Sequence, residues 1–303
     1  MAQDCIGAGI AKSLVLRLCQ ISRSSFYYKP QDGNRQAGRV CSTTTIKRTG
    51  GYESDTQVIE DIKVLLAQEF VDYGYYKTTI YLRQSKEYLI NPKKVYRLMN
   101  EHGLLNLTSR AYNTTKRQWV KELVPNPTAE FTYFEFDIKY IYVHARRAHA
   151  QVLTVLDVFS RWNMGHLIKW TMRKEDVVAL FEMLFETYSL PTQFYVRNDN
   201  GSQFVADVVQ TYFRDRNVVQ EFTKPATPEQ NAHIESYHSI MERAVCKRYE
   251  FDSLAQASET LNRFRDFYNL ERIHSGLHYR SPHQFLLERG VDMQELKSRK
   301  CSN

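Results

Sequence analysis

The sequence predicts an α/β protein in which a mixed sheet is covered by helices on both faces and is preceded by small helical modules. Two hydrophobic periods support this. Apolar residues recur at every second position from residue 131, as in strands, whereas residues 55–105 show the spacing of helices. Beyond residue 131 strand-like stretches are followed by helix-like ones, and a sheet between helical layers accommodates that order.

The composition is that of a soluble globular protein, with 43% hydrophobic and 25% charged residues among 303. No uncharged apolar run approaches the ~18 residues that a membrane span needs, and the N-terminus lacks the order of a secretory signal. The five cysteines include no Cys-x-x-Cys pair, which argues against structural zinc and favours a reducing cytosol. A net charge of +7 favours polyanionic partners, with ordinary surface charge as the alternative.

The N-terminal segment, residues 8–30, predicts a helix, a turn capped by Ser22 and a short second helix that carries Arg23. This helix-turn-helix pattern suits DNA binding, and a plain helical hairpin explains it equally well. Residues 31–54 are polar and contain four glycines, so they predict a flexible linker.

Residues 55–106 predict three short helices. The second covers roughly residues 78–84, and the third begins with Asn91 as N-cap and Pro92 at the first position, and ends at Gly103. The face of the third helix opposite its apolar residues is basic, with Lys93, Lys94 and Arg97. A basic face of this kind suits phosphate contact or entry into a DNA groove, with a solvated surface as the alternative.

The segment 107–126 is basic and unpatterned, and it contains Lys116 and Arg117. It predicts a linker that follows a phosphate backbone, or a plain tether. The sheet follows, with five strands predicted over residues 134–142, 151–158, 165–170, 194–196 and 218–222. The second of these is almost wholly apolar and is therefore expected at the centre of the sheet.

Three carboxylates stand out. Asp137 lies within the first strand, Asp199 follows the fourth strand, where Gly201 allows a sharp turn, and Glu235 lies two turns into a helix that Thr227 is predicted to cap. Each lies among apolar or small residues, where an unpaired charge is costly and a bound cation removes the cost. Carboxylate oxygens suit Mg²⁺ or Mn²⁺, and two such ions ~4 Å apart promote phosphodiester displacement.

Other polar residues near the predicted sheet have less specific contexts. Asp157 favours a structural hydrogen-bonding role over metal binding. His238 falls on the face of its helix that carries Glu235, where it contacts DNA, moves a proton or is simply solvated. Arg272 follows an amphipathic helix and is weakly favoured as a phosphate contact.

The motifs together resemble a known protein family. The strand-borne Asp137, the block 199–204 and Glu235, with 35 residues between the last two carboxylates (235 − 199 − 1), resemble the integrase-type catalytic core. Further stretches resemble the large bacterial insertion-sequence family whose transposase is read from two overlapping frames, and this chain is similar to the second-frame product. These stretches are residues 73–75, 95–99, 157–161 and 268–282.

The resemblance implies an RNase H-like catalytic core at residues 127–289, with a five-stranded mixed sheet, followed by a tail at 290–303. It implies a metal-dependent DNA transposase that cuts its element's inverted-repeat ends and joins the 3′ hydroxyl to target DNA, with Mg²⁺ or Mn²⁺ held by Asp137, Asp199 and Glu235. The helical modules at 8–30 and 55–106 would bind double-stranded DNA. The basic residues expected at DNA are Arg23, Lys93, Lys94, Arg97, Lys116, Arg117 and Arg272.

The resemblance also implies a homo-oligomer on DNA in the bacterial cytoplasm near the nucleoid, without membrane association, and a possible first-frame partner or fusion. Three positions depart from the family's commonest pattern. Lys139 stands where threonine is common, Asn198 where serine is common, and Glu242 where a basic residue is common. Two alternatives stay open: a structure-specific nuclease of the same fold, and a catalytically silent DNA-binding protein derived from a transposase.

Overall fold

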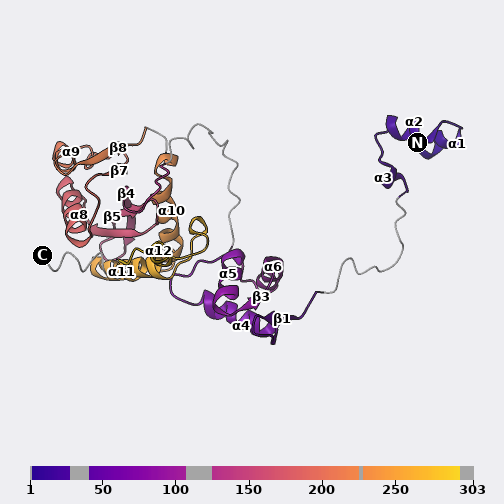
Figure 1. Ribbon diagram of the computed structural model, residues 1–303, viewed down its shortest axis with the longest axis horizontal. Helices are drawn as coiled ribbons and strands as arrows, with labels where there is room; N and C mark the ends of the chain where they lie inside the picture. The colour runs from indigo at the N-terminus through magenta and orange to yellow at the C-terminus, as the bar shows by residue number, and fades with distance from the viewer. Residues whose placement is uncertain (1, 28–40, 107–124, 225–227, 294–303) are drawn as a thin grey trace. The chain divides into compact units, whose positions relative to one another are not determined.

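The computed structural model describes residues 2–27, 41–106, 125–224 and 228–293, and the chain divides into two compact units, residues 1–43 and 44–303. The first unit contains three short helices, α1 (Ala2–Gly7), α2 (Lys12–Leu18) and α3 (Arg23–Tyr27) (Figure 1). The Ser22 hydroxyl accepts a hydrogen bond from the Ser25 N–H at 3.0 Å, as expected of a capping serine. Arg23 begins α3 and is exposed.

The second unit begins with a small antiparallel sheet rather than with a linker. Its strands are β1 (Thr44–Lys47), β2 (Tyr52–Ser54) and β3 (Tyr88–Leu89), in the order β2-β1-β3. The linker predicted over residues 31–54 is therefore wrong from residue 44 onward. Gly50, with φ +93°, provides the left-handed turn between β1 and β2, and the β-branched residues 44–46 favour extended backbone.

Three helices pack against this small sheet: α4 (Asp55–Leu66), α5 (Tyr75–Ser85) and α6 (Pro92–Glu101). The Asn91 side chain accepts a hydrogen bond from the Lys93 N–H at 2.9 Å, so α6 begins where the sequence predicts. Gly103 follows its end with φ +65°. Helix α5 begins before residue 78, because Gly74 serves as its N-cap. The shared core is almost solvent-free and includes Val58, Ile62, Leu82, Val95 and Met99.

The larger sheet region, which begins at β4, is built on five strands: β4 (Tyr133–Val143), β5 (Ala148–Asp157), β6 (Asn163–Lys169), β7 (Phe194–Asn198) and β8 (Val218–Phe222). Their order is β6-β5-β4-β7-β8. Strands β4, β5 and β6 form an antiparallel meander, and β7 and β8 run parallel to β4. This is the predicted RNase H-like mixed sheet, and its central strand is β4 rather than β5.

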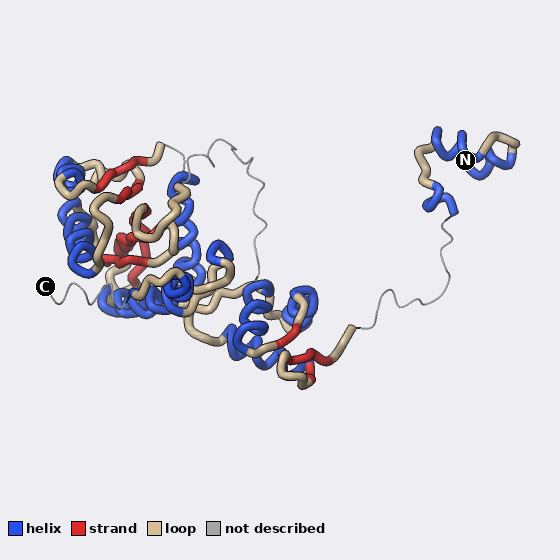
Figure 2. Tube along the Cα trace, viewed as in Figure 1, coloured by secondary structure: helices blue, strands red, loops and turns tan. Residues whose placement is uncertain are grey.

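Helices cover both faces of this sheet, and the alternation along β4 supplies the side chains that they pack against (Figures 1 and 2). On one face, Phe136 packs edge-on against Phe181 of α8 (Lys174–Thr187) and lies in one cluster with Phe213 of α9 (Asp207–Arg214). On the other face, Ile141 lies in one cluster with Tyr237 of α10 (Ala232–Met241), a helix continued by a π-helical turn, Glu242–Cys246. Helices α11 (Leu254–Leu270) and α12 (Pro282–Glu288) complete the region.

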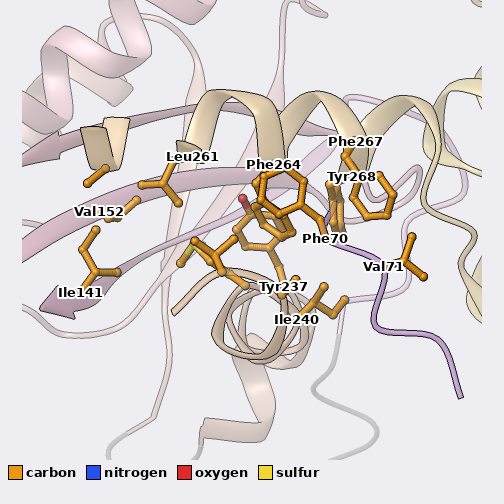
Figure 3. Packing of buried hydrophobic residues seen from close by; sticks show 14 of the residues in the cluster. Phe70, Val71, Ile141, Val152, Tyr237, Ile240, Leu261, Phe264, Phe267 and Tyr268 are labelled. Carbon is orange, nitrogen blue, oxygen red and sulfur yellow. The ribbon is translucent and has the colours of Figure 1, made fainter. Parts of the chain in front are cut away.

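The loop between α4 and α5 packs into a hydrophobic cluster of the larger sheet region (Figure 3). The Phe70 ring lies 5.5 Å from the Phe264 ring and 5.9 Å from the Phe267 ring, both on α11. The Tyr73 hydroxyl accepts a hydrogen bond from the Ile273 N–H at 3.1 Å. The small helical module and the larger sheet region therefore share one hydrophobic cluster. In the ranges that the structure describes, no helix is both long and apolar enough to cross a membrane.

Candidate active site

Sheet register brings the first two carboxylates together. Strand β4 pairs in parallel with β7, and Glu135 lies opposite Arg197. Two residues further along this register, Asp137 faces the position of Asp199, where β7 has just ended. The Asp199 side chain is exposed, and its Oδ1 accepts a hydrogen bond from the Gly201 N–H at 2.9 Å. Asp199 thus lies beside Asp137 at the edge where β7 ends.

The contribution of Gly201 differs from the prediction. The positive-φ glycines of the described chain do not include Gly201, so a left-handed turn is not its purpose. A Cβ at this position would lie 3.1 Å from Asp199 Oδ1 and 2.5 Å from Gln203 Nε2. Glycine therefore gives the Asp199 carboxylate room to approach the backbone.

Glu235 is exposed on the first turn of α10, because the helix begins at Ala232. The prediction of two preceding turns is wrong: residues 228–231 form a 3-10 turn, and the predicted cap Thr227 lies outside the described residues. The cap is instead supplied across the fold. Glu135 Oε2 accepts hydrogen bonds from the His233 N–H at 3.0 Å and the Ile234 N–H at 2.8 Å.

Glu135 is the residue that the sequence reasoning missed. It is fully buried, and burial raises its pKa to about 7 against the opposing effect of the two amide hydrogen bonds. It lies on the same face of β4 as Asp137, two residues earlier. The available signal was a lone glutamate between phenylalanines on an apolar strand, where a buried charge requires a partner. Because Glu135 holds the first turn of α10, it fixes where Glu235 emerges.

The charges of Asp199 and Glu235 act on the third predicted catalytic carboxylate, Asp137. Burial, followed by the charges of Asp199 and Glu235, raises the pKa of Asp137 to about 7. Among the described residues, no group of three or more His, Cys, Asp and Glu side chains is arranged to hold a metal ion. The chemistry of the donor set fits a divalent cation, because three carboxylates repel each other and two of them are exposed.

His238 lies beside Asp137 and is uncharged. Its Nδ1 is 3.6 Å from Asp137 Oδ2, beyond hydrogen-bond length, and burial and the nearby Lys139 lower its pKa to about 3. The contact is therefore not an ion pair, and the side chain, 11% exposed, is not solvated.

Two of the three departures from the family pattern, Lys139 and Glu242, form an ion pair with each other. Lys139 Nζ lies 2.9 Å from Glu242 Oε2, with both side chains partly exposed. Lys139 belongs to β4 and Glu242 to the π-helical turn after α10. The positive charge next to Asp137 therefore comes from the strand, and the turn after the helix supplies the negative charge that pairs with it.

The predicted DNA-binding residues fall into different environments. Lys93 is exposed on α6, whereas Lys94 and Arg97 pair with Asp55 at 2.6 and 2.9 Å. The expectation that Arg272 lies on the surface as a DNA contact is corrected by the structure. Arg272 is 2% exposed and its Nη2 lies 2.7 Å from Asp72 Oδ1, so it is an interior residue. Lys116 and Arg117 lie outside the described residues.

Asp157 has the structural environment that its context favoured. It is fully buried and accepts hydrogen bonds from the Phe131 N–H at 3.0 Å and the Ser160 N–H at 2.8 Å. Burial raises the pKa of Asp157 to about 6. Its carboxylate therefore ties the end of β5 to the entry of β4.

Comparison with known protein families identifies three matching regions. Residues 53–112 match the HTH-like domain, residues 127–228 match the integrase core domain, and residues 216–282 match a second integrase core model. The first two regions correspond to the small helical module and to the part of the sheet that carries Asp137 and Asp199.

Several known proteins are similar along much of the chain. A 39.2 kDa protein of insertion element IS476 from Xanthomonas euvesicatoria is 29% identical over 76% of this chain, and the match spans 65% of that protein. The transposase of IS904 from Lactococcus lactis is 26% identical, over 75% of this chain and 92% of its own length. The transposase InsD of IS2 from Escherichia coli is 23% identical over 96% of both.

Solved structures with related shapes are integrases of retroviruses. A chain of the simian T-cell lymphotropic virus intasome matches with TM-score 0.46 and 10% identity, covering 74% of this chain and 73% of that one. The HTLV-2 integrase catalytic core in complex with magnesium matches with TM-score 0.41 and 12% identity, covering 53% of this chain and 99% of that one.

Proposed function

We propose, from the premise that this chain carries an integrase core domain and an HTH-like domain and is similar to insertion-sequence transposases, that it is itself a DNA transposase. It would cut the ends of its element and join the 3′ hydroxyl to target DNA. One observation supports the proposal: the parallel register of β4 and β7 brings Asp137 to the position where β7 ends and Asp199 follows. Burial first, and then the charges of Asp199 and Glu235, raise the pKa of Asp137 to about 7.

Asp137, Asp199 and Glu235 are the residues that would hold Mg²⁺ or Mn²⁺. When bound, a pair of such ions lowers the barrier to in-line displacement at a phosphodiester. The protein itself contributes by holding the carboxylates in position. The Gly201 N–H fixes the Asp199 carboxylate, and Glu135 fixes the first turn of α10 that carries Glu235. Asp199 and Glu235 are exposed, so a duplex has access to them.

The partners follow from the same proposal. The substrates are double-stranded DNA, both the element's terminal inverted repeats and the target, and the protein acts as a homo-oligomer on DNA, in the bacterial cytoplasm at the nucleoid. A first-frame polypeptide, as partner or fusion, contributes to end recognition. Arg23, Lys93, Lys94 and Arg97 remain the proposed DNA contacts among the described residues, together with Lys116 and Arg117 of the basic segment.

A strand-transfer assay with pre-cut element ends and plasmid target tests the function. The wild-type chain should join ends in Mg²⁺ or Mn²⁺ and stop when EDTA is added. Asp199→Asn should lose joining while still binding duplex DNA. Asp215→Asn, the same change at an exposed position after α9, is the matched control and should retain both.

The outcomes separate the alternatives. Cleavage without joining would favour the structure-specific nuclease. A chain that binds element ends but neither cuts nor joins would favour the silent DNA-binding protein. Joining by Asp199→Asn at the wild-type rate would contradict the assignment of the carboxylates.

A further inference from the structure

A basic cavity of about 310 Å³ lies beside α10. It is lined by side chains from α5, α10, the π-helical turn after α10, the turn between β5 and β6, and the segment that follows α11, and these include Lys77, Arg161, Ser236, Arg243, Arg272 and His274. A volume near 300 Å³ is at the small end of the range for ligand pockets. None of the described residues that line this cavity is acidic.

Two nitrogen atoms at this cavity are buried and unsatisfied. Arg272 Nε and His274 Nε2 have no hydrogen-bond partner among the described residues, although the two residues are only 2% and 8% exposed. A buried polar group without a partner costs about 1–3 kcal/mol, and it marks a place where a ligand or water completes the bonding. Arg272 offers a charged N–H donor there.

The positive charge around the cavity exceeds the negative charge. Asp72 balances part of it, with Oδ1 at 2.7 Å from Arg272 Nη2 and Oδ2 at 3.1 Å from Arg243 Nη2. Glu135 and Asp157 both act on the charge of Arg161, but Glu135 accepts hydrogen bonds from the α10 amides and Asp157 from the Phe131 and Ser160 N–H groups. The four cationic side chains Lys77, Arg161, Arg243 and Arg272 thus face three carboxylates, none of which lines the cavity.

The excess of positive charge affects the pKa of Lys77. Burial, followed by the charge of Arg272 and then of Arg243, lowers the pKa of Lys77 to about 7, against the opposing effect of Asp72. Its ammonium also lies 5.4 Å from the centre of the Tyr73 ring. An anion in the cavity would favour the charged form of Lys77 and offset the repulsion among the cations.

We propose that this cavity binds a phosphate group, and that the source of the phosphate is the backbone of the DNA substrate. Arginine and lysine donors are the side chains that most often contact DNA phosphates, and guanidinium–phosphate hydrogen bonds are among the strongest. Ser236, which lines the cavity, directly follows Glu235 on α10. A backbone phosphate held here would fix the duplex relative to the helix that carries the catalytic glutamate. This inference rests on the proposed function for its choice of DNA.

Two probes test the proposal with the full chain. The first is inorganic phosphate, measured as the rise in melting temperature over sodium chloride at equal ionic strength. The second is a labelled duplex without element sequence, measured by fluorescence anisotropy over a range of salt concentrations. The variants are Lys77→Gln and, because Arg243 is half-exposed and less central to folding, Arg243→Gln. Lys77→Arg is the conservative variant, and Lys174→Gln, an exposed lysine on α8, is the matched control.

Phosphate should stabilise the wild-type chain and Lys174→Gln, and should lose most of this effect in Lys77→Gln and Arg243→Gln. Both cavity variants should bind the duplex about tenfold more weakly, with a salt slope reduced by about one, as for the loss of a single phosphate contact. Lys77→Arg should restore both readouts.

Two results would overturn the proposal. If Lys77→Gln and Arg243→Gln match Lys174→Gln with both probes, the cavity holds no phosphate. If they lose only the response to inorganic phosphate, the cavity takes free phosphate and the DNA source is wrong. Failure of the transposase proposal is distinguishable, because a wild-type chain that never joins DNA ends still yields both binding measurements.

Discussion

The two sides of α10 carry opposite charge. On one side, burial and then the charges of Asp199 and Glu235 raise the pKa of Asp137 to about 7. On the other side, the basic cavity lowers the pKa of Lys77 to about 7. In each place groups of one sign are crowded together, and a ligand of the opposite sign would relieve them.

The basic face of α6 shows what a balanced region looks like. There Asp55 accepts contacts from both Lys94 and Arg97, and Arg97 also pairs with Glu101. Each of these cationic side chains therefore has a carboxylate partner. The comparison supports the two proposals that α10 lies between a site for cations and a site for phosphate.

The largest expected effect is on the acidic side. Glu235→Gln should reduce joining of pre-cut ends by about a thousandfold or more, because residues that act as a unit in catalysis fail together. Duplex binding should stay within about twofold of wild type, since the change removes a negative charge rather than a phosphate contact. Glu182→Gln on the exposed face of α8 is the control, and equal joining by both variants would remove Glu235 from the site.

The second-largest effect is expected at Glu135, which accepts hydrogen bonds from the first turn of α10. Glu135→Ala leaves the amides of His233 and Ile234 without their acceptor, and should lower the free energy of unfolding by about 2–3 kcal/mol in urea titrations. Joining should fall as well, because Glu235 loses its fixed position. Glu135→Gln keeps an acceptor oxygen and should recover most of the stability. A Glu135→Ala chain as stable and active as wild type would show that α10 does not depend on this contact.

The basic side should respond to pH. Because the folded-state pKa of Lys77 is about 7, its ammonium is charged below that pH and is lost as pH rises through it. Duplex affinity should therefore fall by up to about tenfold between pH 6 and pH 8, where DNA phosphodiesters do not titrate. In Lys77→Arg, whose guanidinium stays charged, the fall should disappear; if it persists unchanged, another group causes it.

The smallest effect is expected at the ion pair between Lys139 and Glu242. Glu242→Gln removes a partly exposed ion pair with Lys139, so the free energy of unfolding should change by less than about 1 kcal/mol. The released Lys139 should tighten duplex binding about two- to threefold at low salt. Weaker duplex binding after this change would show that Lys139 needs its partner to reach DNA.

The sequence carries much of this information in local signals. The alternation along β4, the Asn91 cap and the limits of β8 are set by neighbouring residues, so periodicity and capping rules locate them. The sequence also singles out Asp137, Asp199 and Glu235, the proposed metal ligands, because each is a charge in an apolar or small-residue context. The turn from β1 to β2 was missed because polar composition there hides short β-branched segments.

Only the tertiary structure decided the contacts between distant segments. Glu135 caps a helix whose amides lie 98 and 99 residues away, and no local rule predicts an N-cap from another strand. Arg272 meets Asp72 across 200 residues, which makes it an interior ion pair rather than an exposed phosphate contact. The sequence by itself therefore determined which residues carry charge and which elements form. Folding decided which charges meet a partner of opposite sign and which are crowded with charges of the same sign, because that depends on distances between segments that only packing brings together.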